Sequence, residues 1–343
     1  MGGAPMPADH LDLGIELMPD MPIVEAIETA KAAERLGYTY CLITDEGFMH
    51  DPYVLLGALA AQTQSIRLGL ATSGYTRHPA VTAAALASLQ ELSGGRAFVT
   101  VVAGGSMTLG PMGIDRAAPL AVARETMEIL RRLWTGETVN WRGQRYSLDR
   151  ARLAMGAQHI PVWLAARGPK MLELAGEMAD GVVLMGKSDL GPALSRVESS
   201  SAGRVRTRKP ARIYLDRIVC RPEMMTQAAV LYAYTVLDAP ARMLASLGLS
   251  EGTRIRIQEE MEAHGPEAAS RLVSEDMVRR LQICGTPEEC GQELSTLVRE
   301  YRVDVFLLDI VSAGLEENTR YMAETHNLIY SAFGKEVMST EDH

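Results

Sequence analysis

Residues 12–37 read DLGIELMPDMPIVEAIETAKAAERLG and contain one predicted strand followed by one predicted helix. The strand covers residues 12–17. The helix begins at Pro22, carries apolar residues at helical spacing and ends at Gly37. A strand followed by an amphipathic helix is the repeating unit of α/β folds.

The same unit recurs along the whole chain and yields eight strand–helix pairs. Eight pairs predict a (β/α)₈ barrel of the TIM type, one domain over residues 1–343, rather than an open doubly wound sheet. Two segments exceed the minimal barrel: an irregular insertion at 136–160, and a helical insertion at 222–300 between strands seven and eight. The other seven strands are expected at 38–43, 66–72, 97–104, 161–166, 181–185, 211–220 and 303–309.

The composition excludes several classes of protein. A net charge of −9 argues against a nucleic-acid surface, which requires a basic face. No apolar run is long enough to cross a bilayer, and no signal-peptide pattern is visible at the start. Cys41, Cys220, Cys284 and Cys290 have neither metal-site nor disulfide-framework spacing. We therefore expect free thiols, no metal and a soluble cytoplasmic protein.

Glu16 is unusual because it lies in an otherwise apolar strand. Side chains alternate along a strand, so Leu13, Ile15 and Leu17 share one face and Gly14 and Glu16 the other. The bulky face suits the surrounding helices, which places Glu16 inward, near the carboxyl-end mouth where barrel enzymes hold their chemistry. Partial desolvation there would raise its pKa and suit it to donate a proton. The alternative is a structural role, in an ion pair with an arginine or as a loop cap.

The other strand ends carry polar or glycine-rich loops at the same rim. ITDEGFMHDP follows strand two and contains Asp45, and ATSGYTRHP follows strand three and contains Thr72 and Ser73. AGGSMTLGPMG follows strand four, and its glycines Gly104 and Gly105 permit close approach of a flat ligand. Loop capping and ordinary chain flexibility are the structural alternatives for these residues.

AARGPKMLELAGEMADG, which follows strand five, predicts an anion site. Gly168 precedes Pro169 at the first helical position, and free N–H groups at such a helix start can bind an anion. Arg167 and Lys170 add positive charge beside it. We expect a phosphate group here; the alternative is a tight turn with solvated basic residues.

Several stretches together resemble the bacterial luciferase-like superfamily, and within it the coenzyme F420-dependent branch that includes the methylene-tetrahydromethanopterin reductases. In the C-terminal part the similarity lies mainly in the order of the elements, with CGTPEEC (284–290) before a helix and strand eight. The matching stretches are LGIELMPDMPI (13–23), AAERLGYTYCLITDEG (32–47), DPYVLLGALAAQTQSIRLG (51–69), HPAVTAAALASLQELSGGRA (78–97) and PVWLAARGPKMLELAGEMADGVVL (161–184).

The resemblance implies a barrel that binds a deazaflavin in its mouth and transfers hydride from C5 of that coenzyme. It implies a catalytic glutamate at the end of strand one, here Glu16, and a non-prolyl cis peptide in a bulge near Ala71 to Ser73. It also implies a homodimer or higher homo-oligomer. The expected coenzyme-binding residues are Asp45, Ala71, Thr72, Ser73, Gly104, Gly105, Ser106, Ala165, Arg167, Gly168, Pro169, Lys170, Met185 and Gly186.

Two positions depart from the reductase pattern. The reductases carry Asn-Pro in the bulge after strand three, where this chain has ATSGYTRHP, and Asp in the loop after strand four, where it has Ser106. We therefore expect an F420-dependent oxidoreductase acting on a small organic substrate, with a folate-type or methanopterin-type methylene-tetrahydropterin as one candidate. The alternatives are an FMN-dependent monooxygenase, a flavin-independent methylene-tetrahydrofolate reductase, or a barrel that binds a ligand without turnover.

Overall fold

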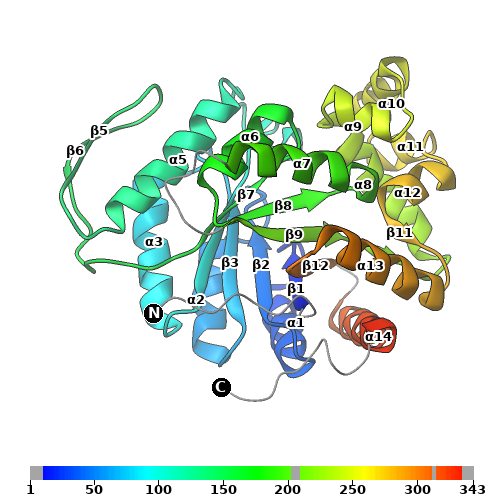
Figure 1. Cartoon of the computed structure of the whole chain (residues 1–343), viewed down its shortest axis with the longest axis horizontal. Helices are drawn as coiled ribbons and strands as arrows, with labels where there is room; N and C mark the ends of the chain where they lie inside the picture. Colours follow the sequence, from blue (N-terminus) through cyan, green and yellow to red (C-terminus); the bar gives the residue numbers. More distant parts are fainter. Residues whose placement is uncertain (1–10, 202–208, 311–313, 334–343) are drawn as a thin grey trace.

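A closed barrel of parallel strands forms the centre of the molecule (Figure 1). The computed structural model describes residues 11–201, 209–310 and 314–333. Within them the strand order around the barrel is β1-β12-β9-β8-β7-β4-β3-β2, which confirms the predicted fold. The barrel strands are β1 (Asp12–Leu17), β2 (Tyr40–Thr44), β3 (Arg67–Thr72), β4 (Ala97–Val101), β7 (Val162–Ala165), β8 (Gly181–Met185), β9 (Ala211–Asp216) and β12 (Val305–Ile310).

Helices connect these strands and surround the barrel (Figure 1). Their starts follow local signals: Asp51 accepts hydrogen bonds from the backbone N–H groups of Tyr53 and Val54, and His78 accepts one from Ala80. His78 therefore has a structural role. The helices outside residues 218–286 are α1 (Ile23–Arg35), α2 (Pro52–Gln62), α3 (Pro79–Leu92), α4 (Ser106–Leu109), α5 (Pro119–Leu133), α6 (Pro169–Met178), α7 (Leu190–Ser200), with the short 3₁₀ helix η1 (Lys187–Asp189) before it, α13 (Pro287–Tyr301) and α14 (Leu315–Phe333).

The segment 136–160, expected to be irregular, instead contains a two-stranded antiparallel sheet of β5 (Val139–Arg142) and β6 (Ser147–Ala151). Its turn is held by one carboxylate, since Glu125 of α5 accepts hydrogen bonds from the backbone N–H groups of residues 144 to 146. A buried acceptor on the preceding helix gives this hairpin a fixed shape that the residue pattern of the hairpin itself does not reveal.

Between β9 and β12 the chain forms several helices, which Figure 1 shows grouped on one side of the barrel. Two short strands that pair in parallel frame this group. Asp216, at the end of β9, ties the group to the barrel by accepting a hydrogen bond from the backbone N–H of Ile283, at 3.1 Å. The elements are β10 (Ile218–Val219), α8 (Met224–Leu237), α9 (Ala241–Ser246), α10 (Glu251–His264), α11 (Pro266–Ser270), α12 (Glu275–Leu281) and β11 (Ile283–Cys284), followed by α13.

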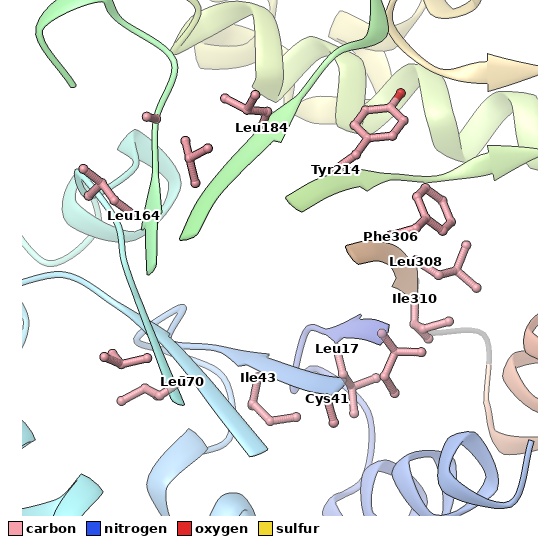
Figure 2. Packing of buried hydrophobic residues seen from close by; sticks show 14 of the residues in the cluster. Leu17, Cys41, Ile43, Leu70, Leu164, Leu184, Tyr214, Phe306, Leu308 and Ile310 are labelled. Carbon is pink, nitrogen blue, oxygen red and sulfur yellow. The ribbon is translucent and has the colours of Figure 1, made fainter. Parts of the chain in front are cut away.

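The outward-facing side chains of the strands form the main hydrophobic core with the helices. Leu13, Ile15 and Leu17 of β1 are buried in it, as their alternation predicts. Figure 2 shows Leu17, Ile43 and Leu184 directed away from the ring of strands. Burial of such side chains contributes about 1.5–3 kcal/mol each, so this layer stabilises the barrel from outside.

A second, smaller core fills the inside of the barrel and rests on glycines. Three inward-facing glycines each lie opposite an aromatic residue of the neighbouring strand, in register. The three aromatic rings have centroids 4.5 to 5.5 Å apart and close the barrel. A Cβ atom at any of the three glycines would lie under 3.0 Å from its aromatic partner. The pairs are Gly14 with Tyr40, Gly69 with Phe98, and Gly181 with Trp163.

The four cysteines are free, and Cys284 is the one that is partly exposed. None of the helices in the described ranges is both long and apolar enough to span a bilayer.

We predict that Gly69→Ala destabilises the protein, because the added Cβ would lie 2.1 Å from the Phe98 ring. Overpacking of a filled core costs about 1–3 kcal/mol. Gly252→Ala, at an exposed position of α10, is the matched control and should leave stability unchanged or raise it by up to about 1 kcal/mol, because Ala favours a helix over Gly. Urea unfolding of both variants measures the difference. Equal stability of the two would contradict the role of the glycine–aromatic pairs.

Candidate active site

A cavity of about 800 Å³ opens at the carboxyl ends of the barrel strands. Its inner surface begins directly above the aromatic layer, with the next inward-facing residue of every barrel strand. Six of these residues are small or uncharged, whereas Glu16 and Asp309 carry carboxyl groups. The full set is Glu16, Leu42, Ala71, Thr100, Ala165, Val183, Leu215 and Asp309.

Glu16 lies inward in the cavity, as its place in the strand predicts. No group in the described part of the chain donates a hydrogen bond to its carboxyl. The donors nearby bind the neighbouring carboxyls of Asp45, Glu46 and Asp309 instead. Burial raises the pKa of Glu16 well above its usual value, and the nearby carboxyls of Asp309 and Glu46 raise it further. Arg167 and Arg217 oppose this rise. The arrangement therefore favours a protonated acid that faces a ligand.

An ion pair lies beside Glu16. Arg217, whose side chain is 2% exposed, donates from Nη2 to Oδ2 of Asp309 at 2.8 Å. The backbone N–H of Arg217 binds Oδ1 of Asp216 at 2.8 Å. Burial raises the pKa of Asp216 to about 7, although three donors, including the Tyr214 hydroxyl, hydrogen-bond to its carboxylate.

Two further carboxyls lie on the outer part of the wall. Glu46, which follows β2, accepts a hydrogen bond from the Thr108 hydroxyl at 2.6 Å, and burial raises its pKa. Asp238, at the end of α8, accepts hydrogen bonds from the backbone N–H and hydroxyl of Ser106 at 3.2 and 3.1 Å. The loop after β4 is thereby fastened to the helical insertion across the mouth.

Most of the predicted coenzyme-binding residues line this cavity, and two do not. Thr72 instead donates its hydroxyl to Asp45 at 2.8 Å, and Ser106 is engaged by Asp238. The alternation of side chains along a strand explains why Thr72 faces away from the cavity, because its neighbours Ala71 and Ser73 face into it. The residues that line it are Asp45, Ala71, Ser73, Gly104, Gly105, Ala165, Arg167, Gly168, Pro169, Lys170, Met185 and Gly186.

The cis peptide expected near Ala71 to Ser73 is absent, since the described residues contain no cis peptide bond. The strand instead continues regularly to its end: the carbonyl of Ala71 accepts from Asp45 N–H, and that of Thr72 from Val102 N–H. Because β3 is paired to its end with the segments on both sides of it, no bulge forms. The expectation of a bulge with a cis bond was therefore wrong.

The residues after β7 divide into two groups. Arg167 turns inward and donates to Sδ of Met185 at 3.1 Å, and burial lowers its pKa while Asp238 and Glu16 oppose that change. Gly168, Pro169 and the exposed Lys170 lie at the start of α6, which has no side-chain cap. The helix start and Lys170 can therefore receive an anion, whereas Arg167 belongs to the group around Glu16.

Sequence reasoning missed Arg217 and Asp309. The same alternation that identified Glu16 could have found Asp309, the last inward residue of β12. Tyr234 and Gln282 of the insertion also line the cavity, but no sequence pattern marks them as wall residues. Among the described residues, no three His, Cys, Asp or Glu side chains are grouped to hold a metal ion.

Comparisons with known proteins agree with this geometry. The chain is 31% identical to the 5,10-methylenetetrahydromethanopterin reductase of Methanolobus tindarius, over 84% of this chain and 91% of the relative. It is also 31% identical to the enzyme of that name from Archaeoglobus fulgidus, over 84% and 90%. The coenzyme F420-dependent tetrahydromethanopterin reductase from Methanopyrus kandleri has the same fold, with a TM-score of 0.83, 24% identity, and coverage of 95% and 100%.

The family model described as luciferase-like monooxygenase matches residues 7–304, most of the chain. Together with the two relatives that share 31% of their residues with it, this match establishes that the chain belongs to the luciferase-like monooxygenase family.

Proposed function

We propose that this protein is a coenzyme F420-dependent oxidoreductase that transfers a hydride between the deazaflavin and a small organic substrate. The observation that carries the proposal is Glu16, a carboxyl without a hydrogen-bond partner in the described residues, on the floor of a large cavity at the barrel mouth. The names of the two relatives support a methylene-tetrahydropterin, of methanopterin or folate type, as the first substrate to test.

The cavity has the features that a flat coenzyme needs. A volume of about 800 Å³ is in the range of small-molecule sites, and small residues such as Ala71, Gly104 and Ala165 leave room for ring faces. The start of α6 and Lys170 would take a phosphate group. Ser73 and Asp45, after β3 and β2, offer further polar contacts on the wall. We therefore assign these residues to coenzyme binding.

In this proposal Glu16 acts as a general acid. A methylene bridge between two pterin nitrogens opens to an iminium when one of the nitrogens is protonated, and Glu16 would give that proton. Bound F420 supplies the hydride that the opened carbon accepts. Arg167 and Arg217 stabilise the carboxylate that Glu16 becomes, because both favour its ionised form. The walls hold the two reactants in line and exclude water.

Glu16→Gln should abolish most turnover, because an amide has the same shape but no acidic proton. A lost general acid costs about 10²–10⁴ in rate, whereas the dissociation constant for F420 should change less than about twofold. The assay mixes protein with reduced F420 and methylene-tetrahydropterins under anaerobic conditions and follows coenzyme absorbance. Glu34→Gln is the matched control, because Glu34 binds backbone N–H groups outside the cavity.

The same assay, together with a parallel measurement of oxygen uptake in air, decides between the proposal and its alternatives. Consumption of reduced F420 by the wild type supports it. Oxygen uptake with reduced FMN would indicate a monooxygenase, and binding of neither coenzyme would indicate a flavin-independent protein. Unchanged turnover in Glu16→Gln would remove Glu16 from the mechanism.

Lys170→Ala should weaken F420 binding by roughly threefold to tenfold, equivalent to about 1 kcal/mol for a charge-assisted contact. The loss should shrink at high salt, because exposed charges are screened. Lys31→Ala, on α1 and paired with Glu28, is the control. Fluorescence titration with F420 provides the constants. Equal affinity for both variants at low salt would place the phosphate elsewhere.

We further propose a cytoplasmic homodimer. Four free cysteines suit a reducing compartment. Val24, Val54 and Val81 are 68%, 63% and 54% exposed, and each lies in the first turn of one of three neighbouring helices, α1 to α3. An apolar patch of this kind is typical of a protein interface.

The double variant Val54→Asp/Val81→Asp should therefore be monomeric where the wild type is dimeric. Sedimentation velocity measures both masses. Val24 can be left in place, since two buried charges suffice to oppose association. A wild-type monomer at micromolar concentration, or an unchanged dimer in the variant, would contradict this interface.

A further inference from the structure

Two carboxyl groups lie next to each other on the floor of the cavity. Glu16 of β1 and Asp309 of β12 are register partners on neighbouring parallel strands, and both side chains face inward. Neighbouring strands are about 4.8 Å apart. Two carboxylates at such a separation in a partly desolvated site resist being ionised together, so one of them tends to hold a proton.

The hydrogen bonds distinguish the two groups. Asp309 is engaged by Nη2 of Arg217 at 2.8 Å, whereas Glu16 has no such donor among the described residues. A guanidinium stabilises the ionised form of the carboxyl that it contacts. The ion pair therefore assigns the negative charge to Asp309 and leaves the proton to Glu16.

Two further charged groups face Glu16. Arg167, after β7, donates to Sδ of Met185 and is influenced by the charges of both Asp238 and Glu16. Glu46, after β2, accepts the Thr108 hydroxyl. Behind the ion pair, the Tyr321 hydroxyl of α14 is occupied by the backbone N–H and carbonyl of residue 218. Glu16 is thus the carboxyl in this group that accepts no hydrogen bond from the described residues, whereas Glu46 and Asp309 each accept one.

Arg217 is buried, and two of its three nitrogens have no hydrogen-bond partner among the described residues. Its side chain is 2% exposed, and Nε and Nη1 have no hydrogen-bond partner in the part of the chain that the structure describes. The cation therefore keeps an effect on its surroundings beyond Asp309, and it favours ionised Glu16. When Glu16 passes its proton from Oε to a ligand atom, Arg217 is already in place to stabilise the remaining carboxylate.

We propose that Asp309 and Arg217 are positioning residues with opposite effects on Glu16: Asp309 keeps the proton on Glu16, and Arg217 makes that proton easier to transfer. This inference rests on the proposed function for its catalytic meaning, but the location of the proton is a property of the protein alone. It can be measured without coenzyme, substrate or turnover. Failure of the proposed reaction and failure of this inference are therefore distinguishable.

The experiment follows the infrared C=O stretch of protonated carboxyls in the free protein as the pH is raised. The Glu16 band is identified by its loss in Glu16→Gln. In Asp309→Asn this band should vanish at a pH lower by roughly one unit or more, because repulsion is removed and Arg217 is left facing Glu16. In Arg217→Gln it should persist to higher pH, because Asp309 is no longer neutralised.

Two controls separate this role from a merely structural one. Arg217→Lys retains the cation and should move the midpoint less than Arg217→Gln does. Asp180→Asn weakens the ion pair of Asp180 with Arg131, at 3.1 Å and outside the cavity, and should leave the Glu16 midpoint unchanged. Near-ultraviolet circular dichroism reports whether each variant is folded.

Opposite shifts in Asp309→Asn and Arg217→Gln support the inference, even if no F420 is consumed. An unmoved midpoint in both variants, or a rise in Asp309→Asn, would overturn it. If Asp309→Asn does not fold, the contrast between Arg217→Gln and Arg217→Lys decides, because equal midpoints in these two would contradict control by the cation.

Discussion

The contact between three inward-facing glycines and three aromatic rings is the constraint on which the rest of the structure depends. Because each glycine lies opposite an aromatic residue in register, the barrel can be filled by large rings without separating its strands. These rings close the interior below the mouth. The cavity therefore has a rigid floor, and the next residue of each strand has a fixed height above it.

Charge is unevenly distributed on that floor. Six strands contribute small or uncharged side chains, and two neighbouring strands contribute Glu16 and Asp309. The arginines that balance them follow β9, the neighbour of β12, and β7, which lies across the barrel from β1. The two acidic groups of the floor thus lie side by side on neighbouring strands. This asymmetry gives a bound ligand a defined orientation relative to the proton.

Alternation and helix signals were sufficient to predict the barrel, the inward direction of Glu16 and the helix that starts at Pro169. They also placed most of the cavity wall, because the ends of parallel strands share one edge. The hairpin at 139–151 depends on Glu125, a partner on another element. Arg217 was missed and Ser106 was wrongly expected to line the cavity, because their contacts, Asp309 and Asp238, are distant in sequence.

The helical insertion is fastened to the barrel by carboxylates on two sides of the opening. Asp216 of β9 binds the insertion at Ile283, and Asp238 of the insertion binds the loop after β4 at Ser106. Neither fastening involves the glycines or aromatic rings beneath. Evolution can therefore reshape the helical insertion for a ligand of different shape by changing a few polar contacts, while the floor of the barrel keeps its form.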